Sequence, residues 1–159
     1  MCEPPVTARG KPPNWWWLML PASYLAHLCE EWWGGEGFAS WTARVVGAPV
    51  SETRFIVVNS IAAPVFVLGT VLAITKPKRA WFIVTLGTIV LINGLLHVLG
   101  TAGSRSYSPG VITGTVLYLP LGILALRLGR RRLLDTTLWA AVALGVVIHA
   151  MVAIVAFWR

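Results

Sequence analysis

Predominantly apolar runs alternate with short charged or glycine-rich segments along the chain. The runs cover residues 15–33, 55–75, 80–99, 111–128 and 136–158. Each run is close to the ~20 residues that a helix needs to cross a bilayer. The pattern therefore predicts an all-α, polytopic membrane protein with five transmembrane helices.

The segments between the runs differ in character. Residues 1–14 hold four prolines and show no periodicity, so we predict a flexible tail that precedes a single five-helix domain over residues 15–159. Residues 34–53 are rich in glycine and mixed in polarity. They predict an external loop segment between the first two helices, with a short interfacial helix around residues 38–46. Residues 76–79 form a tight basic turn.

Composition supports a membrane protein. Hydrophobic residues make up 57% of the chain and charged residues only 12%, which is far more apolar than an average soluble domain. The net charge is +7, but the basic residues lie in short groups between apolar runs, which argues against a nucleic-acid partner. We expect membrane lipid and a lipophilic small molecule as partners. The oligomeric state stays open.

The basic residues also predict the orientation in the membrane. With five spans, nine of the thirteen Lys and Arg fall on one side, in the tail and in the turns at residues 76–79 and 127–132. Lys and Arg concentrate on the cytoplasmic side of membrane proteins. We therefore predict a multi-pass protein of the plasma (cell inner) membrane with a cytoplasmic N-terminus and an external C-terminus.

Several ionisable and polar residues fall at one predicted depth. A helix rises ~1.5 Å per residue, so these residues lie roughly 18–25 Å from the inner interface of a hydrocarbon core ~30 Å thick. They are His27, Glu30, Glu31, Asn59, His97 and His149. Charge at this depth is costly and is usually functional. We predict one shared polar site in the outer half of the membrane. Alternatively, the two glutamates mark only the water interface of the first span.

Imidazole and carboxylate groups are the usual ligands of zinc, iron and manganese. His27 and Glu31 are four residues apart, so they share one face of a helix and can bind the same ion. His97 and His149 complete the predicted ligand set from the third and fifth spans. We therefore expect a divalent metal cofactor, with Glu30 orienting a ligand or acting as a general base on metal-bound water.

Other polar residues supply candidates for catalysis and substrate binding. Asn93 shares a helix face with His97 and is suited to fixing a histidine tautomer or binding a substrate oxygen. The candidate catalytic residues are Glu30, Glu31, Asn93 and Tyr107, and the candidate substrate-binding residues are Tyr24, Asn59 and Tyr118. Each His or Asn taken alone also fits a simpler role, because these residues often hydrogen-bond between membrane helices.

Four motifs occur in order along the chain: HLCEE at residues 27–31, NGLLH at 93–97, YSPG at 107–110 and a histidine at 149. Together they resemble the HXXEE family of small prokaryotic integral membrane proteins. The resemblance covers nearly the whole chain and implies a membrane enzyme. It implies no particular substrate or reaction. The site residues that it implies are His27, Glu30, Glu31, Asn93, His97, Tyr107 and His149.

We expect an integral membrane enzyme that uses a metal ion to hydrolyse a lipophilic substrate, with Glu30 or Glu31 carrying the proton. Two alternatives stay open. The first is a metal-free acid/base isomerase or cyclase of an isoprenoid- or polyketide-like compound. The second is a small proton- or metal-coupled transporter, although the chain shows no repeated halves of the kind that many transporters have.

Overall fold

The computed structural model describes residues 14–48 and 50–158, and every regular element in these two stretches is a helix. Four helical segments are long and apolar enough to cross a membrane: α3 (Glu52–Thr75), α4 (Trp81–Ser104), the segment Val111–Arg132 and α7 (Asp135–Phe157). They coincide with the second to fifth predicted spans. The prediction of an all-helical, multi-pass membrane protein is confirmed to this extent.

The first predicted span consists of two helical pieces. α1 (Met19–Trp33) is an α-helix of 15 residues, and the 3₁₀ helix η1 (Asn14–Leu18) leads directly into it. α1 alone is therefore shorter than the other four segments. The predicted tail lies outside the described residues except for Asn14.

One wide turn interrupts the segment Val111–Arg132. The π-helical turn η3 (Gly114–Tyr118) joins α5 (Val111–Thr113) to α6 (Leu119–Arg132). Pro120 follows this turn directly. Proline has no N–H to donate, and its ring clashes with the preceding turn, so a helix widens or bends at this point.

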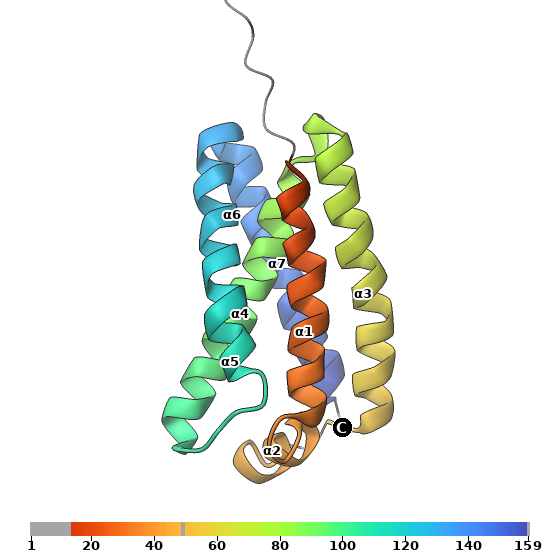
Figure 1. Cartoon of the computed structure of the whole chain (residues 1–159), viewed down its shortest axis with the longest axis vertical. Helices are drawn as coiled ribbons and strands as arrows, with labels where there is room; N and C mark the ends of the chain where they lie inside the picture. The colour runs from red at the N-terminus through yellow and green to blue at the C-terminus, as the bar shows by residue number, and fades with distance from the viewer. Residues whose placement is uncertain (1–13, 49, 159) are drawn as a thin grey trace, which may run out of the picture.

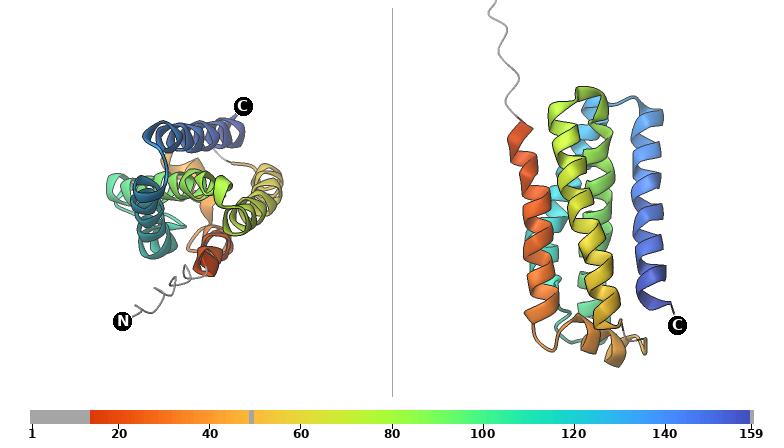
Figure 2. Two further views of the ribbon diagram at one scale, coloured as in Figure 1. Left: turned by 90° about the horizontal axis from the view of Figure 1, so that it is seen from above. Right: turned by 90° about the vertical axis from the view of Figure 1, so that its right-hand side faces the viewer.

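α4 forms the centre of the bundle, with α3, α6 and α7 packed around it (Figure 1, Figure 2). Small residues at these contacts let the helices approach closely. A Cβ on Gly122 of α6 would lie 2.6 Å from Leu91 Cβ, and one on Gly145 of α7 would lie 2.7 Å from Thr88 Cβ. α1 packs beside α3, and together with η1 it helps to enclose an apolar core: Trp17, Leu20, Phe66, Leu86, Val90 and Leu121.

Large apolar side chains also cover the outside of the bundle. On α3 and α7 these include Ile56, Ile61, Leu68, Val147, Met151 and Ile154, each about half exposed or more. An apolar surface of this extent is unusual for a protein in water. It is the surface expected of helices that face lipid.

The two ends of the bundle carry different connections. η2 (Pro77–Arg79) and the α6–α7 connection lie at the end where η1 begins, whereas α2 (Phe38–Val45) and the α4–α5 connection lie at the other end (Figure 1). The basic residues of the two tight turns thus share one end. This arrangement matches the predicted distribution of Lys and Arg between the two sides.

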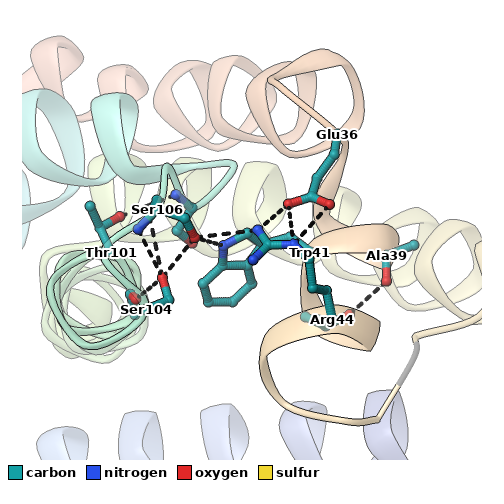
Figure 3. Close-up of polar contacts among 10 residues, drawn as sticks. Glu36, Ala39, Trp41, Arg44, Thr101, Ser104 and Ser106 are labelled. Carbon is teal, nitrogen blue, oxygen red and sulfur yellow. Dashed lines mark hydrogen bonds and ion pairs between the residues drawn. The ribbon is translucent and has the colours of Figure 1, made fainter.

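α2 confirms the short helix predicted between the first two spans. Its Trp41 is buried, and the indole N–H donates to Ser106 Oγ at 3.3 Å (Figure 3). A Cβ on Gly100 of α4 would lie 2.8 Å from the Trp41 ring. Arg44 donates to Glu36 from Nε at 3.1 Å and to Ser106 from Nη2 at 3.3 Å. These contacts dock α2 on the α4–α5 connection.

We predict that Gly122→Leu weakens the contact between α4 and α6. The added side chain has no space beside Leu91, and overpacking of this kind typically costs about 1–3 kcal/mol. Unfolding of the detergent-solubilised protein measures the loss. Gly103→Leu is the control, because a Cβ on Gly103 would meet nothing within 4 Å. Equal stabilities of the two variants would contradict the close approach.

Candidate metal centre

Three ionisable side chains from two helices meet inside the bundle. His27 and Glu31 lie one turn apart on α1, and His97 lies on α4. Glu31 Oε1 is 3.5 Å from His27 Nε2 and 3.2 Å from His97 Nε2, and the three atoms that could bind a metal lie within 4.8 Å of one another. Their exposed fractions are only 2% for His27, 7% for Glu31 and 5% for His97. We call these three residues the triad.

A hydroxyl group contacts the other ring nitrogen of His27. His27 Nδ1 lies 2.8 Å from Thr113 Oγ1 in α5. The same hydroxyl donates to Glu30 Oε2 at 2.5 Å. His27 is therefore held between the triad on one side and a threonine–carboxylate pair on the other, an arrangement that is common around histidines that bind metals.

Glu30 points away from the triad, to the first turn of α5. Its carboxylate accepts from the backbone N–H groups of Ile112 at 2.9 Å and Thr113 at 2.7 Å, and from the Tyr107 hydroxyl at 2.7 Å. The N–H groups of a first helical turn have no partner within the helix and favour negative charge. Glu30 and Tyr107, both predicted to be catalytic, thus tie α1 to the α4–α5 connection.

The turn over residues 107–110 packs against both histidines. Ser108 Oγ is completely buried and lies 3.0 Å from His97 Nδ1. Gly110 has a φ of 101°, and a Cβ on it would lie 2.7 Å from the Cε1 atoms of both His27 and His97. Only glycine meets both requirements, the left-handed backbone and the close approach to two rings.

Aromatic and polar side chains surround the triad. The ring centroid of Phe38, at the start of α2, lies 5.6 Å from that of His97, and the Tyr118 ring lies 4.3 Å from that of His27. Tyr24, one turn before His27 on α1, donates to Asn59 Oδ1 at 2.5 Å. The predicted substrate-binding residues therefore lie at the triad (Tyr118) or one helical turn from it (the Tyr24–Asn59 pair).

Asn93 lies one turn before His97 on α4. Its Oδ1 is buried and has no hydrogen-bond partner among the described residues. No hydrogen bond from Asn93 to either triad histidine is found in this part of the chain, so the ring nitrogens are served by Thr113 and Ser108 instead. The amide oxygen is left available to a ligand.

His149, the fourth predicted ligand, does not belong to the group of ligand atoms that lie within 4.8 Å of one another, which among the described residues consists of His27, Glu31 and His97. His149 lies on α7, one turn after Gly145, through which α7 packs against Thr88 of α4. The structure therefore brings three of the four predicted ligands together.

The three ligand atoms of the triad, all within 4.8 Å of one another, could hold a divalent metal ion. Ligand atoms on a tetrahedral zinc ion with bonds of about 2.0–2.1 Å are about 3.3 Å apart. The two distances to Glu31 Oε1, 3.5 Å and 3.2 Å, are close to that value. His27 Nε2 is also buried without a hydrogen-bond partner among the described residues. A buried polar atom without a partner is costly, and a cation between it and Glu31 would remove that cost.

Comparison with known families agrees with the motifs in the sequence. A family model described as a protein of unknown function with HXXEE motif matches residues 17–125, well over half of the chain. The chain belongs to the HXXEE family. His27, Glu30 and Glu31 are the residues of the HXXEE motif itself, and the matched HXXEE region also contains His97. No curated protein and no solved structure matches the chain.

Sequence reasoning missed Thr113, Ser108 and Gly110 as site residues. The YSPG motif includes Ser108 and Gly110, but Tyr107 is the one residue of this motif among the predicted site residues. A serine or threonine beside a turn is common, and nothing local distinguishes one that contacts a histidine. Their role depends on how the α4–α5 connection folds back onto α1, which becomes visible only in three dimensions.

We predict that Gly110→Ala destabilises the protein more than Gly47→Ala. Both glycines have positive φ, 101° and 71°, so both variants carry the backbone strain, which is on the order of 1–3 kcal/mol. Only at Gly110 does the new methyl group also meet the two imidazole rings, whereas at Gly47 it meets nothing within 4 Å. Chemical unfolding of the two variants measures the difference, and equal losses would refute the close packing at Gly110.

A second prediction concerns the alkaline titration of Tyr107, which lies outside the membrane-spanning segments. Partial burial and the hydrogen bond to Glu30 raise the pKa of Tyr107 from 10.0 to about 12. Because the folded pKa is the higher one, the contact stabilises the protein below pH 10.0 and is lost as pH rises through about 12.

Phenolate absorbance, taken as the difference between the wild type and Tyr107→Phe, should therefore show a midpoint near pH 12 for Tyr107. Glu30→Gln removes the charge beside the phenol and should move this midpoint down toward the ordinary value. A wild-type midpoint at the ordinary tyrosine value would show that the Tyr107–Glu30 contact is absent in solution.

Proposed function

We propose that this HXXEE protein is an integral membrane enzyme that binds a divalent metal ion through the triad and hydrolyses a lipophilic substrate. Zinc is the first candidate, and iron or manganese the next. The convergence of two Nε2 atoms on one buried Glu31 oxygen carries the proposal. Three protein ligands leave a coordination position open, as in catalytic zinc sites, and a metal there acidifies water and polarises a carbonyl oxygen.

The roles of the two glutamates follow from their contacts. Glu30 already accepts hydrogen bonds from α5 and Tyr107. We therefore assign Glu30 a role in orienting its neighbours rather than in proton transfer. Glu31 contributes Oε1 to the triad, which leaves its other carboxylate oxygen to accept a proton from water. We therefore assign the proton transfer to Glu31, and the binding of a substrate oxygen to Asn93.

We infer that η1 and α1 together form one more membrane span, the first along the chain, which brings the number of spans to five. Their 5 and 15 residues, at rises of about 2.0 and 1.5 Å, give a length of about 32 Å, close to the hydrocarbon thickness of ~30 Å. If the basic end of the bundle is cytoplasmic, the triad lies in the outer half of the membrane. A lipophilic substrate would then reach it from the surrounding lipid.

Access to the triad requires a moving part, because its three side chains are almost completely buried. Two cavities of the bundle are lined by other side chains, at Trp17 and Arg132 in one case and at Trp81 and Thr136 in the other. α2 covers the triad through Phe38, and Gly37 precedes α2 with a φ of 77°. We propose that α2 shifts to admit the substrate.

The second candidate function is a metal-free acid/base isomerase or cyclase of an isoprenoid- or polyketide-like compound. One observation favours it. The Tyr118 ring packs on His27, and Tyr24 lies one turn away, so two phenols accompany the buried histidine–glutamate pair. Such a set could exchange protons with an apolar substrate without a metal.

The metal content of the purified protein tests the first candidate. We predict about one zinc ion per chain in the wild type, as expected for a single site of this kind. His27→Ala, Glu31→Gln and His97→Ala should each lose most of the bound metal, because two remaining ligands do not hold the ion. His149→Ala should keep it, because His149 is not among the three residues whose ligand atoms lie together.

Folding controls accompany these variants. Unfolding in detergent with metal-free protein separates loss of ligand from loss of fold. A wild-type protein that neither contains nor takes up zinc, iron or manganese would exclude the metalloenzyme and leave the acid/base candidate. Metal loss in His149→Ala equal to that in His97→Ala would contradict the three-residue ligand set.

A further inference from the structure

We propose that Thr113 is a positioning residue that fixes the ring tautomer of His27, with Glu30 determining where the Thr113 proton lies. The inference rests on the metal site proposed above and deepens it. It adds the contact that prepares His27 to bind a cation, and neither residue touches the metal position itself.

Hydrogen-bond donors and acceptors decide the tautomer. Thr113 has one hydroxyl proton and three neighbours: Glu30 Oε2 at 2.5 Å, His27 Nδ1 at 2.8 Å and, at the longer distance of 3.4 Å, the backbone oxygen of Gly110. An ionised carboxylate only accepts, and hydrogen bonds to it are stronger than neutral ones. The proton therefore goes to Glu30, and the Thr113 oxygen accepts from His27 Nδ1–H. A neutral imidazole carries one N–H, so Nε2 keeps a free lone pair.

Other contacts keep this pair in place. Glu30 also accepts from the Thr113 backbone N–H at 2.7 Å, from Ile112 N–H and from Tyr107. Three further donors favour an ionised Glu30 at this position. Thr113 is held to it by both its backbone and its side chain, so rotation of the hydroxyl away from His27 would break a strong contact.

The consequence is an acceptor pair at the centre of the triad. The free lone pair of His27 Nε2 and the Glu31 carboxylate face each other at 3.5 Å. Without a cation they repel, whereas the opposite tautomer would donate from Nε2 to Glu31. Thr113 thus disfavours the state in which His27 Nε2–H donates to Glu31 and favours a state in which both atoms can bind a metal ion.

His97 differs from His27 in this respect. Its Nδ1 meets Ser108 Oγ at 3.0 Å, and no second acceptor of the Ser108 hydroxyl is found among the described residues. Ser108 can therefore donate or accept. The tautomer of His97 is free to adjust, and that of His27 is not.

Zinc titration of the metal-free, full-length protein tests the proposal. Thr113→Val keeps the size and the backbone N–H but removes the hydroxyl, and it should bind zinc roughly 10–100-fold more weakly, the usual effect of losing a group that orients a ligand. Thr113→Ser keeps the hydroxyl and should bind like the wild type. Thr88→Val removes another buried hydroxyl, on the far face of α4, and should also bind like the wild type.

Nitrogen-15 NMR of histidine in the metal-free protein reads the tautomer directly. We expect His27 to carry its proton on Nδ1 in the wild type and in Thr113→Ser, and on Nε2 in Thr113→Val. A wild-type His27 protonated on Nε2, or Thr113→Val binding zinc like the wild type, would overturn the proposal. The wild-type spectrum alone is decisive if Thr113→Val does not fold.

The two readouts separate this proposal from the metal site. A wild-type protein that binds neither zinc nor iron nor manganese but has the Nδ1–H tautomer would refute the metal centre and support the role of Thr113. A wild-type protein that binds zinc but has the Nε2–H tautomer would support the metal centre and refute the role of Thr113.

Discussion

A carboxylate buried inside an apolar helical bundle must be compensated, and the structure is organised around that requirement at Glu31. An unpaired charge in such surroundings costs several kcal/mol or more. In the metal-free protein His97 of α4 can donate to Glu31 Oε1, and a cation between Glu31 and His27 would complete the compensation, so the buried carboxylate joins α1 to the central helix. The turn that ends at Gly110 closes over the two rings and helps to bury this group.

The two consecutive glutamates of the motif have different tasks because a helix rotates by about 100° per residue. Glu31 faces the imidazoles, and Glu30 faces the first turn of α5, where backbone N–H groups lack partners. Thr113 joins the two environments, since its hydroxyl touches both Glu30 and His27. The spacing of the motif is therefore explained by two different neighbours, one ionisable and one a helix terminus.

Counting residues from the membrane interface was enough to bring His27, Glu31 and His97 to one level, and apolar runs were enough to locate four membrane-spanning helices and α2. Depth, however, is only one coordinate. It does not say on which side of α4 a neighbouring helix packs, so depth alone could not show that His149 falls outside the group of His27, Glu31 and His97. It also carries no information about Thr113 and Ser108, whose roles arise from the α4–α5 connection and the wide turn before Pro120.

Different helices pack against the two faces of α4. Toward α7 it presents Thr85, whose hydroxyl donates to Ala141 O at 3.1 Å, and Thr88, against which Gly145 packs. On another side it presents Gly94, against which Gly114 of η3 packs closely, and His97, which contacts Glu31 of α1. The family match ends at residue 125, before α7 begins, yet contains every residue of the triad and its hydrogen-bonded supports. α7 therefore packs against α4, while the triad and the residues that hydrogen-bond to it lie on α1, α4, α5 and the α4–α5 connection.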